Sequence, residues 1–120
     1  IRVGSRKTLE HALLATGFAY RHSDKEASLP DDSFNAILPI CGDIRRAGAA
    51  TLDLAYVACG RLDGDWEKGL HIWDIAAGIL LVKEAGGMIC DTNGGENYLK
   101  SGDVVAANMN LVKQMIKVIK

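Results

Sequence analysis

The sequence lacks the features that mark several common classes of protein. Its three cysteines are widely spaced and form no C-x-x-C pair, which fits neither a disulfide framework nor a zinc ribbon. Fourteen basic and fifteen acidic residues leave a net charge of −1, which excludes a nucleic-acid binder or membrane anchor held by bulk positive charge. No apolar run reaches the roughly 18 residues of a membrane span. These absences predict reduced thiols in a cytoplasmic protein.

Signatures of several enzyme mechanisms are absent as well. The sequence contains no nucleophile elbow, no phosphate-binding Walker loop and no G-x-G-x-x-G dinucleotide motif. It begins with Ile1 rather than methionine, and its first residues show no signal-peptide pattern. We therefore expect a chain that starts within a longer protein, and not a secreted one.

The composition suits a folded α/β domain. The 120 residues are 48% hydrophobic, and a chain of this length buries about two-thirds of its surface on folding. Apolar runs of strand length alternate with longer stretches of helical periodicity, which predicts the α/β class. The length corresponds to one domain or to half of a larger one.

Residue patterns predict the main helices and strands. Buried strands are expected in short apolar runs: Leu13–Gly17, Met88–Asp91 and Val104–Ala107. Helices are expected over four longer stretches: Pro30–Ile40, with Pro39 ending or kinking it, Ala47–Cys59, Trp73–Ala85, and Asn108 or Asn110 to Lys120. Leu62–Gly69 is interpreted as an acidic turn that includes a short strand.

Two carboxylates are the main candidates for chemistry. Asp74 opens a very apolar helix, where it serves either as an N-cap or as a rigidly held ligand for Mg²⁺, which prefers oxygen ligands. Glu67 stands in an acidic segment with Asp63 and Asp65. It is either a solvated turn residue or an acceptor of hydrogen bonds from substrate hydroxyls, each worth roughly 1.5–3 kcal/mol. Taken alone, both residues favour the structural interpretation.

Small residues open the other strong helix. At Gly48, Ala49 and Ala50, the lack of large side chains lets an anion approach the free N–H groups of a helix start, or lets two helices pack closely. Arg45 precedes this start and is either a surface charge or a partner for a carboxylate. His71 has no second ligand at metal spacing, so a partly buried hydrogen-bonding role is the simpler interpretation.

Linked motifs along most of the chain resemble the inositol monophosphatase family. The run EKGLHIWDIAAG at Glu67–Gly78, followed by EAGG at Glu84–Gly87, is similar to the family's W-D-x-A-A/G-[AG] and E-A-G-G signature. Upstream, IRRAGAATLDLAYVA at Ile44–Ala58 resembles its R-R-x-G-S-A-A-L-D-L-A-Y-V-A helix. VVAAN at Val104–Asn108 resembles a late strand end of the family.

The resemblance implies a fold and an activity for a larger protein. Residues 1–120 would be the C-terminal half of a layered, mixed-sheet α/β/α/β/α sandwich, usually dimeric. The activity would be Mg²⁺-dependent hydrolysis of inositol monophosphate to inositol and phosphate, by attack of a metal-activated water on phosphorus. The family's Glu-Glu pair and D-P-[IL]-D-G-T motif belong to the preceding half and do not occur here. No catalytic residue is therefore expected in this half, and the isolated chain is expected to be inactive.

The resemblance also assigns roles to residues of this half. Asp74 would hold the metal ion, and Glu67 would accept a hydroxyl of the inositol ring. The backbone at the start of the upstream helix would line the substrate: Gly48, Ala49 and Ala50. Arg45 and His71 would neighbour the site without a chemical step. The family usually has Ser or Thr where this chain has Ala49, which leaves the substrate preference open.

Two alternatives stand beside inositol monophosphate. Relatives of the same fold act on histidinol phosphate, fructose bisphosphate or nucleotide phosphates, so another small phosphate ester is the first alternative. Bacterial relatives are also associated with transcription complexes, so a non-catalytic, transcription-associated partner is the second. We expect a cytoplasmic protein without membrane association, and nothing in the sequence itself supports contact with nucleic acid.

Overall fold

The computed structural model describes residues 1–17, 32–46 and 49–119, and the side chains of Asp32, Ile72 and Asp74 also lie outside this description. In chain order the elements are β1 (Leu13–Gly17), α1 (Asp32–Ile37), the 3-10 turn η2 (Leu38–Ile40), β2 (Asp43–Arg45), α2 (Ala50–Ala58), β3 (Gly64–Glu67), α3 (Ile72–Glu84), β4 (Met88–Cys90), α4 (Tyr98–Ser101), β5 (Val104–Ala107) and α5 (Met109–Ile119). The strands form one five-stranded sheet in the order β2-β1-β3-β5-β4. It is a mixed sheet, because β1 runs parallel to β2 and β3 while β5 runs antiparallel to β3 and β4.

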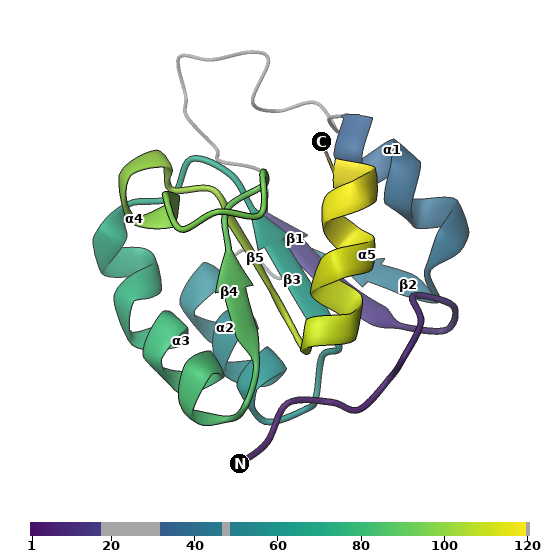
Figure 1. The fold of residues 1–120 in the computed structure, drawn as a ribbon, viewed down its shortest axis with the longest axis horizontal. Coiled ribbons are helices and arrows are strands. Elements are labelled where there is room, and N and C mark those ends of the chain that lie inside the picture. The colour runs from purple at the N-terminus through teal and green to yellow at the C-terminus, as the bar shows by residue number, and fades with distance from the viewer. Residues whose placement is uncertain (18–31, 47–48, 120) are drawn as a thin grey trace.

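Helices cover both faces of the sheet and enclose two apolar cores (Figure 1). Successive residues of a strand point to opposite faces, so each core takes every second residue of the central strands. The core under α2 and α3 includes the strand residues Ala15, Val104 and Ala106. The core under α1 and α5 includes Leu14, Trp66 and Val105. Asp65 and Glu67 flank Trp66 and therefore face the core under α2 and α3.

Most of the predicted elements are confirmed. β1 and β5 have the predicted bounds, and β4 ends one residue earlier than predicted. α3 begins one residue before Trp73 and ends one residue before Ala85. α5 follows Asn108, whose Oδ1 caps it by accepting the backbone N–H of Leu111 at 2.9 Å. No helix in the described part of the chain has both the length and the apolar character to cross a membrane.

The predicted helix around Pro39 is shorter than expected. α1 ends at Ile37, and the chain continues through Pro39 as η2. Proline provides no backbone N–H and clashes with the preceding helical turn, which explains the end of the α-helix. Pro30, the predicted start, lies outside the described residues.

The short strand expected within Leu62–Gly69 is confirmed, and bends flank it on both sides. Gly64–Glu67 forms β3, whose four residues are all buried in the middle of the sheet. Two of its four residues are acidic, and charged side chains are rare in a fully buried strand. The strand is therefore difficult to predict from the sequence pattern. β2 and α4 are additional elements that the patterns do not predict, because one has three residues and the other a single turn.

Helix α2 begins later than predicted and packs closely on α3. It starts at Ala50 after an N-cap at Ala49, whose backbone is extended with φ −138°. Ala47, the predicted start, lies outside the described residues. A Cβ at Gly78 of α3 would lie 2.6 Å from Cβ of Leu54, so glycine permits this approach of the two helices. The pair covers the sheet face that carries Asp65 and Glu67.

Candidate functional site

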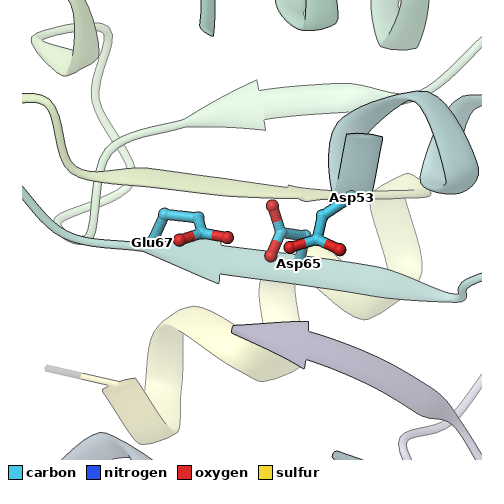
Figure 2. A group of neighbouring side chains, drawn as sticks. All are labelled: Asp53, Asp65 and Glu67. Carbon is cyan, nitrogen blue, oxygen red and sulfur yellow. The ribbon is translucent and has the colours of Figure 1, made fainter. Parts of the chain in front are cut away.

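Three acidic side chains meet between β3 and the first turn of α2 (Figure 2). Asp65 and Glu67 lie two residues apart on β3 and so point to the same face of the sheet. Asp53 lies in the first turn of α2, which contacts β3 on that face. One carboxylate oxygen from each of the three residues lies within 4.8 Å of the other two. Figure 2 shows the three carboxylates turned toward one another.

This cluster, here called the acidic triad (Asp53, Asp65 and Glu67), is removed from solvent. The exposed fractions of the three residues are 1%, 0% and 2%. Oδ2 of Asp53, both carboxylate oxygens of Asp65 and Oε1 of Glu67 have no hydrogen-bond partner in the described part of the chain. A buried carboxylate without compensation is costly, since it loses its hydration. The triad therefore requires either bound protons or a cation.

Burial raises the pKa of all three carboxyl groups. It is the largest cause in each case, and it raises the pKa of Glu67 to about 8. The negative charges of Glu67 and Asp53 add to burial and raise the pKa of Asp65 well above its usual range. For Asp53, the interaction with Glu67 and the positive charge of Arg45 oppose the effect of burial without cancelling it, so its pKa is also raised. Glu67 therefore holds a proton at neutral pH unless a cation replaces it.

A glycine at the end of β1 makes room for Glu67. Gly17 pairs with Glu67 in the register of the two parallel strands. A Cβ at Gly17 would collide with Oε2 of Glu67. The backbone N–H of Gly17 lowers the pKa of Glu67, although by less than burial raises it. The carboxylate thus rests against bare backbone at the end of the strand.

The structure brings several of the predicted site residues together. Ala49 is the N-cap of α2 and Ala50 is its first residue, so both stand where a helix leaves backbone N–H groups free. The carbonyl of Ala49 accepts the backbone N–H of Asp53 at 3.0 Å. Asp53 in turn lies beside Glu67 in the triad. Glu67 and the start of α2 are therefore neighbours in space.

Two other predicted residues lie outside the triad. Arg45 ends β2 with an exposed side chain, and its charge acts on Asp53. His71 is exposed and its ring stacks on that of Trp73, with 4.3 Å between the ring centroids. The interpretation of His71 as a partly buried residue is therefore wrong. Its stacking on Trp73 places it at the start of α3.

Two predicted residues fall partly or wholly outside the description. Gly48 is not among the described residues, and neither is the side chain of Asp74. The backbone of Asp74 lies inside the first turn of α3, two residues after its start at Ile72, and not at the cap position. Their predicted roles toward substrate and metal stay predictions.

Two members of the triad are not identified as site residues from the sequence. Asp53 stands in a nearly apolar helix, and Asp65 in a segment interpreted as a turn. The interpretation of Glu67 as a solvated turn residue is wrong, because this side chain is 2% exposed. The signal that identifies all three is an acidic side chain at a position of core periodicity.

Relatives of the chain are bacterial proteins of about twice its length. The sequence profile of the inositol monophosphatase family matches residues 1–120. The chain is 48% identical over 123 residues to the Nus factor SuhB of Pseudomonas aeruginosa, an alignment that covers 100% of this chain and 45% of that protein. The Nus factor SuhB of Haemophilus influenzae is 43% identical over 123 residues, with the same coverage. The chain spans about half the length of the curated relatives it matches.

Solved structures share the fold over the same fraction of their length. The extragenic suppressor protein suhB from Bartonella henselae superposes with a TM-score of 0.89 at 39% identity, covering 99% of this chain and 45% of that one. The inositol monophosphatase from Anabaena superposes with a TM-score of 0.89 at 35% identity, covering 99% of this chain and 47% of that one. The mixed sheet with helices on both faces therefore matches part of a larger fold, as the sequence motifs predict.

Proposed function

The chain belongs to the inositol monophosphatase family, and we propose that it forms the C-terminal portion of a Mg²⁺-dependent phosphomonoesterase. The proposed reaction is hydrolysis of inositol monophosphate to inositol and phosphate. The observation that carries the proposal is the meeting of Glu67, at the end of β3, with the first turn of α2. The complete enzyme, a proposed cytoplasmic homodimer with the family's metal motifs ahead of this chain, is called the intact protein below.

The donor chemistry of the site suits Mg²⁺. Mg²⁺ prefers oxygen ligands and is usually held by one or two carboxylates together with substrate phosphate. The described side chains that meet at this site offer carboxylate oxygens, with no imidazole nitrogen or thiolate sulfur among them. Asp74, in the neighbouring first turn of α3, is the proposed ligand in this half, and the preceding half supplies the others. When bound, the ion supplies positive charge that neutralises phosphoryl oxygens and acidifies the attacking water.

The residues of this chain bind and orient the substrate in this proposal. Backbone N–H groups at the start of α2, from Gly48, Ala49 and Ala50, face the phosphate ester, since a helix N-terminus attracts an anion. Glu67 accepts a hydrogen bond from a ring hydroxyl. Its carboxylate is 2% exposed in the structure, so this contact requires the carboxylate to become accessible at the end of β3. Arg45 offsets part of the negative charge on Asp53.

Replacing Glu67 with Gln in the intact protein is expected to impair the hydrolysis of inositol monophosphate more than that of an aryl phosphate. The amide removes a charged hydrogen bond worth roughly 1.5–3 kcal/mol, which corresponds to a fall in kcat/KM of about 10- to 100-fold. An aryl phosphate has no inositol hydroxyl, so its hydrolysis does not depend on this hydrogen bond. Steady-state kinetics on the two substrates measures the difference.

Asp43→Asn is the matched control for this experiment, because it removes an exposed carboxylate on β2. It should leave both activities unchanged. Equal losses on the two esters in Glu67→Gln would contradict the role of Glu67 toward the ring hydroxyl. Adding histidinol phosphate to the assay tests the alternative substrate, and a preference for it would displace inositol monophosphate.

An apolar face on α3 supports the placement of a preceding half beside this chain. Trp73 and Leu80 share one side of the helix and are 73% and 60% exposed. Leu52 on the neighbouring α2 is 45% exposed. Large apolar patches are uncommon on monomeric soluble proteins. Because the relatives are about twice as long, we propose that the preceding half of the intact protein covers this face.

The isolated chain is therefore expected to self-associate. Water contact with the apolar side chains of α3 is unfavourable, and association of copies removes it. Sedimentation velocity over a wide concentration range should show a rising average mass, and Leu80→Lys should reduce it. A monomer with a sharp thermal transition at every concentration would contradict the proposed covering of α3.

A non-catalytic, transcription-associated role is the second candidate function. It is favoured by the name Nus factor SuhB, which relatives at 43% and 48% identity carry. The two candidates separate in a phosphatase-defective variant of the intact protein tested in cells that depend on it. Full rescue by that variant supports the second candidate, and loss of rescue supports the phosphatase.

A further inference from the structure

The proposed reaction leaves part of the acidic triad without a role. Glu67 is assigned to the substrate, but Asp53 and Asp65 are not. Asp65 is the most enclosed of the three, because it is 0% exposed and neither carboxylate oxygen has a hydrogen-bond partner in the described part of the chain. Figure 2 shows its carboxylate directed toward those of Asp53 and Glu67. A buried, unpartnered carboxylate in this position points to a missing positive group.

Within the part of the chain that the structure describes, the surroundings of Asp65 do not supply that group. Its register neighbours on the adjacent strands are Ala15 and Ala106, which belong to the apolar core. The charged groups that act on Asp65 are Glu67 and Asp53, and both are acidic. A bound cation would balance these charges at the centre of the triad.

The geometry and chemistry of the triad define the kind of cation. Oxygen ligands lie about 2.0–2.6 Å from Mg²⁺ or Ca²⁺, so oxygens in one coordination sphere are at most about 4–5 Å apart. The three oxygens of the triad lie within 4.8 Å of one another. All donors are carboxylates, with no imidazole nitrogen or thiolate sulfur among them. Such a set selects a hard cation over zinc or copper.

We propose that Asp53, Asp65 and Glu67 bind one hard divalent cation, at a site separate from the ion assigned to Asp74. Oε1 of Glu67, which has no partner, faces the cation, while Oε2 stays beside Gly17 at the end of β3 and remains the acceptor for the ring hydroxyl. The bound ion links β3 to the first turn of α2 and so holds the helix start in place relative to Glu67. This inference rests on the geometry of the triad and stands independently of the proposed phosphatase activity.

A Mn²⁺ titration of the intact protein tests the proposal, with the Asp74→Asn variant as the parent. Electron paramagnetic resonance counts free Mn²⁺ and therefore the number of ions bound per chain. The additional change Asp65→Asn keeps the shape of the side chain and removes a ligand. It should lower the count by one. At about 100 times the dissociation constant, Mn²⁺ should raise the Tm of the parent by about 5 °C more than that of the double variant.

Two further variants make the result decisive. Asp53→Asn in the same parent should also lower the count by one, while Asp43→Asn, on the exposed strand β2, should leave it unchanged. An equal count and an equal Tm shift with and without Asp65 would overturn the proposal and leave a triad held by protons alone. The phosphatase assay of Asp74→Asn against unmodified protein fails or succeeds separately, so the two proposals are distinguished.

Discussion

Replacing Asp74 with Asn in the intact protein is expected to reduce Mg²⁺-dependent phosphate release by about 100-fold or more. A metal ion contributes several kcal/mol of charge stabilisation in the transition state, and each 1.36 kcal/mol corresponds to a factor of about ten in rate. The amide oxygen keeps the shape of the side chain but loses the negative charge that holds the ion. Steady-state kinetics over a range of Mg²⁺ concentrations measures both the rate and the metal requirement.

The control for this prediction is Asp103→Asn. Asp103 lies outside the triad and its Oδ1 accepts the backbone N–H of Gly69 at 2.9 Å. An amide oxygen can accept the same hydrogen bond, so the control should keep its activity. Near-normal turnover of Asp74→Asn at saturating Mg²⁺ would refute the assignment of Asp74 as a metal ligand.

The stability of the intact protein without divalent cations is expected to fall as the pH rises from about 5 to 8. Burial raises the pKa of Glu67 from 4.5 to about 8, and those of Asp65 and Asp53 are raised as well. Between these values the folded state holds more protons than the unfolded state, so the free energy of unfolding decreases with pH. The loss should be on the order of 3 kcal/mol, or a decrease in Tm of about 10 °C.

The direction of this effect separates the triad from ordinary carboxylates. Asp91 accepts backbone N–H groups from Gly95 and Asn93, and these hydrogen bonds lower its pKa from 3.8. A carboxyl group whose pKa is lowered by folding stabilises the folded state at pH values above its usual pKa, and this stabilisation is lost in acid. The effect of Asp91 therefore falls below the pH range in which Glu67 loses its proton. Thermal unfolding in a chelator, repeated at several pH values, measures the combined slope.

Asp65→Asn should flatten this pH dependence. The amide does not titrate, so the raised pKa of Asp65 no longer contributes to the slope. The variant should therefore be more stable than the unmodified protein at pH 8 in chelator, and about equal to it near pH 5. The same slope in both proteins would contradict the assignment of the effect to the triad.

The longer helices α2, α3 and α5 and the strands β1, β4 and β5 could be predicted because their residues carry local signals. The apolar stripe of α3 ends at Gly86 and Gly87, and Asn108 marks the start of α5. β3 could not be recognised with the same certainty, because two of its four residues are acidic. Its position between β1 and β5 depends on contacts with distant parts of the chain, which local periodicity does not encode.

The candidate site divides in the same way. Glu67 could be identified from its motif and its distance from Asp74 along the chain. The triad could not, because Asp53 and Asp65 come together only when α2 packs on β3. Gly17 is a further example, because a side chain at this position would collide with the carboxylate of Glu67 on the neighbouring strand β3. Local motifs therefore reveal the chemistry of single residues, and tertiary packing decides which of them meet.

Phosphate release from inositol 1-monophosphate by the intact protein is the measurement that tests the proposed function most directly. Release should require Mg²⁺, saturate with substrate and fall about 100-fold or more in Asp74→Asn. A folded intact protein that releases no phosphate at saturating Mg²⁺, or one whose Asp74→Asn variant turns over at the unmodified rate, would contradict it.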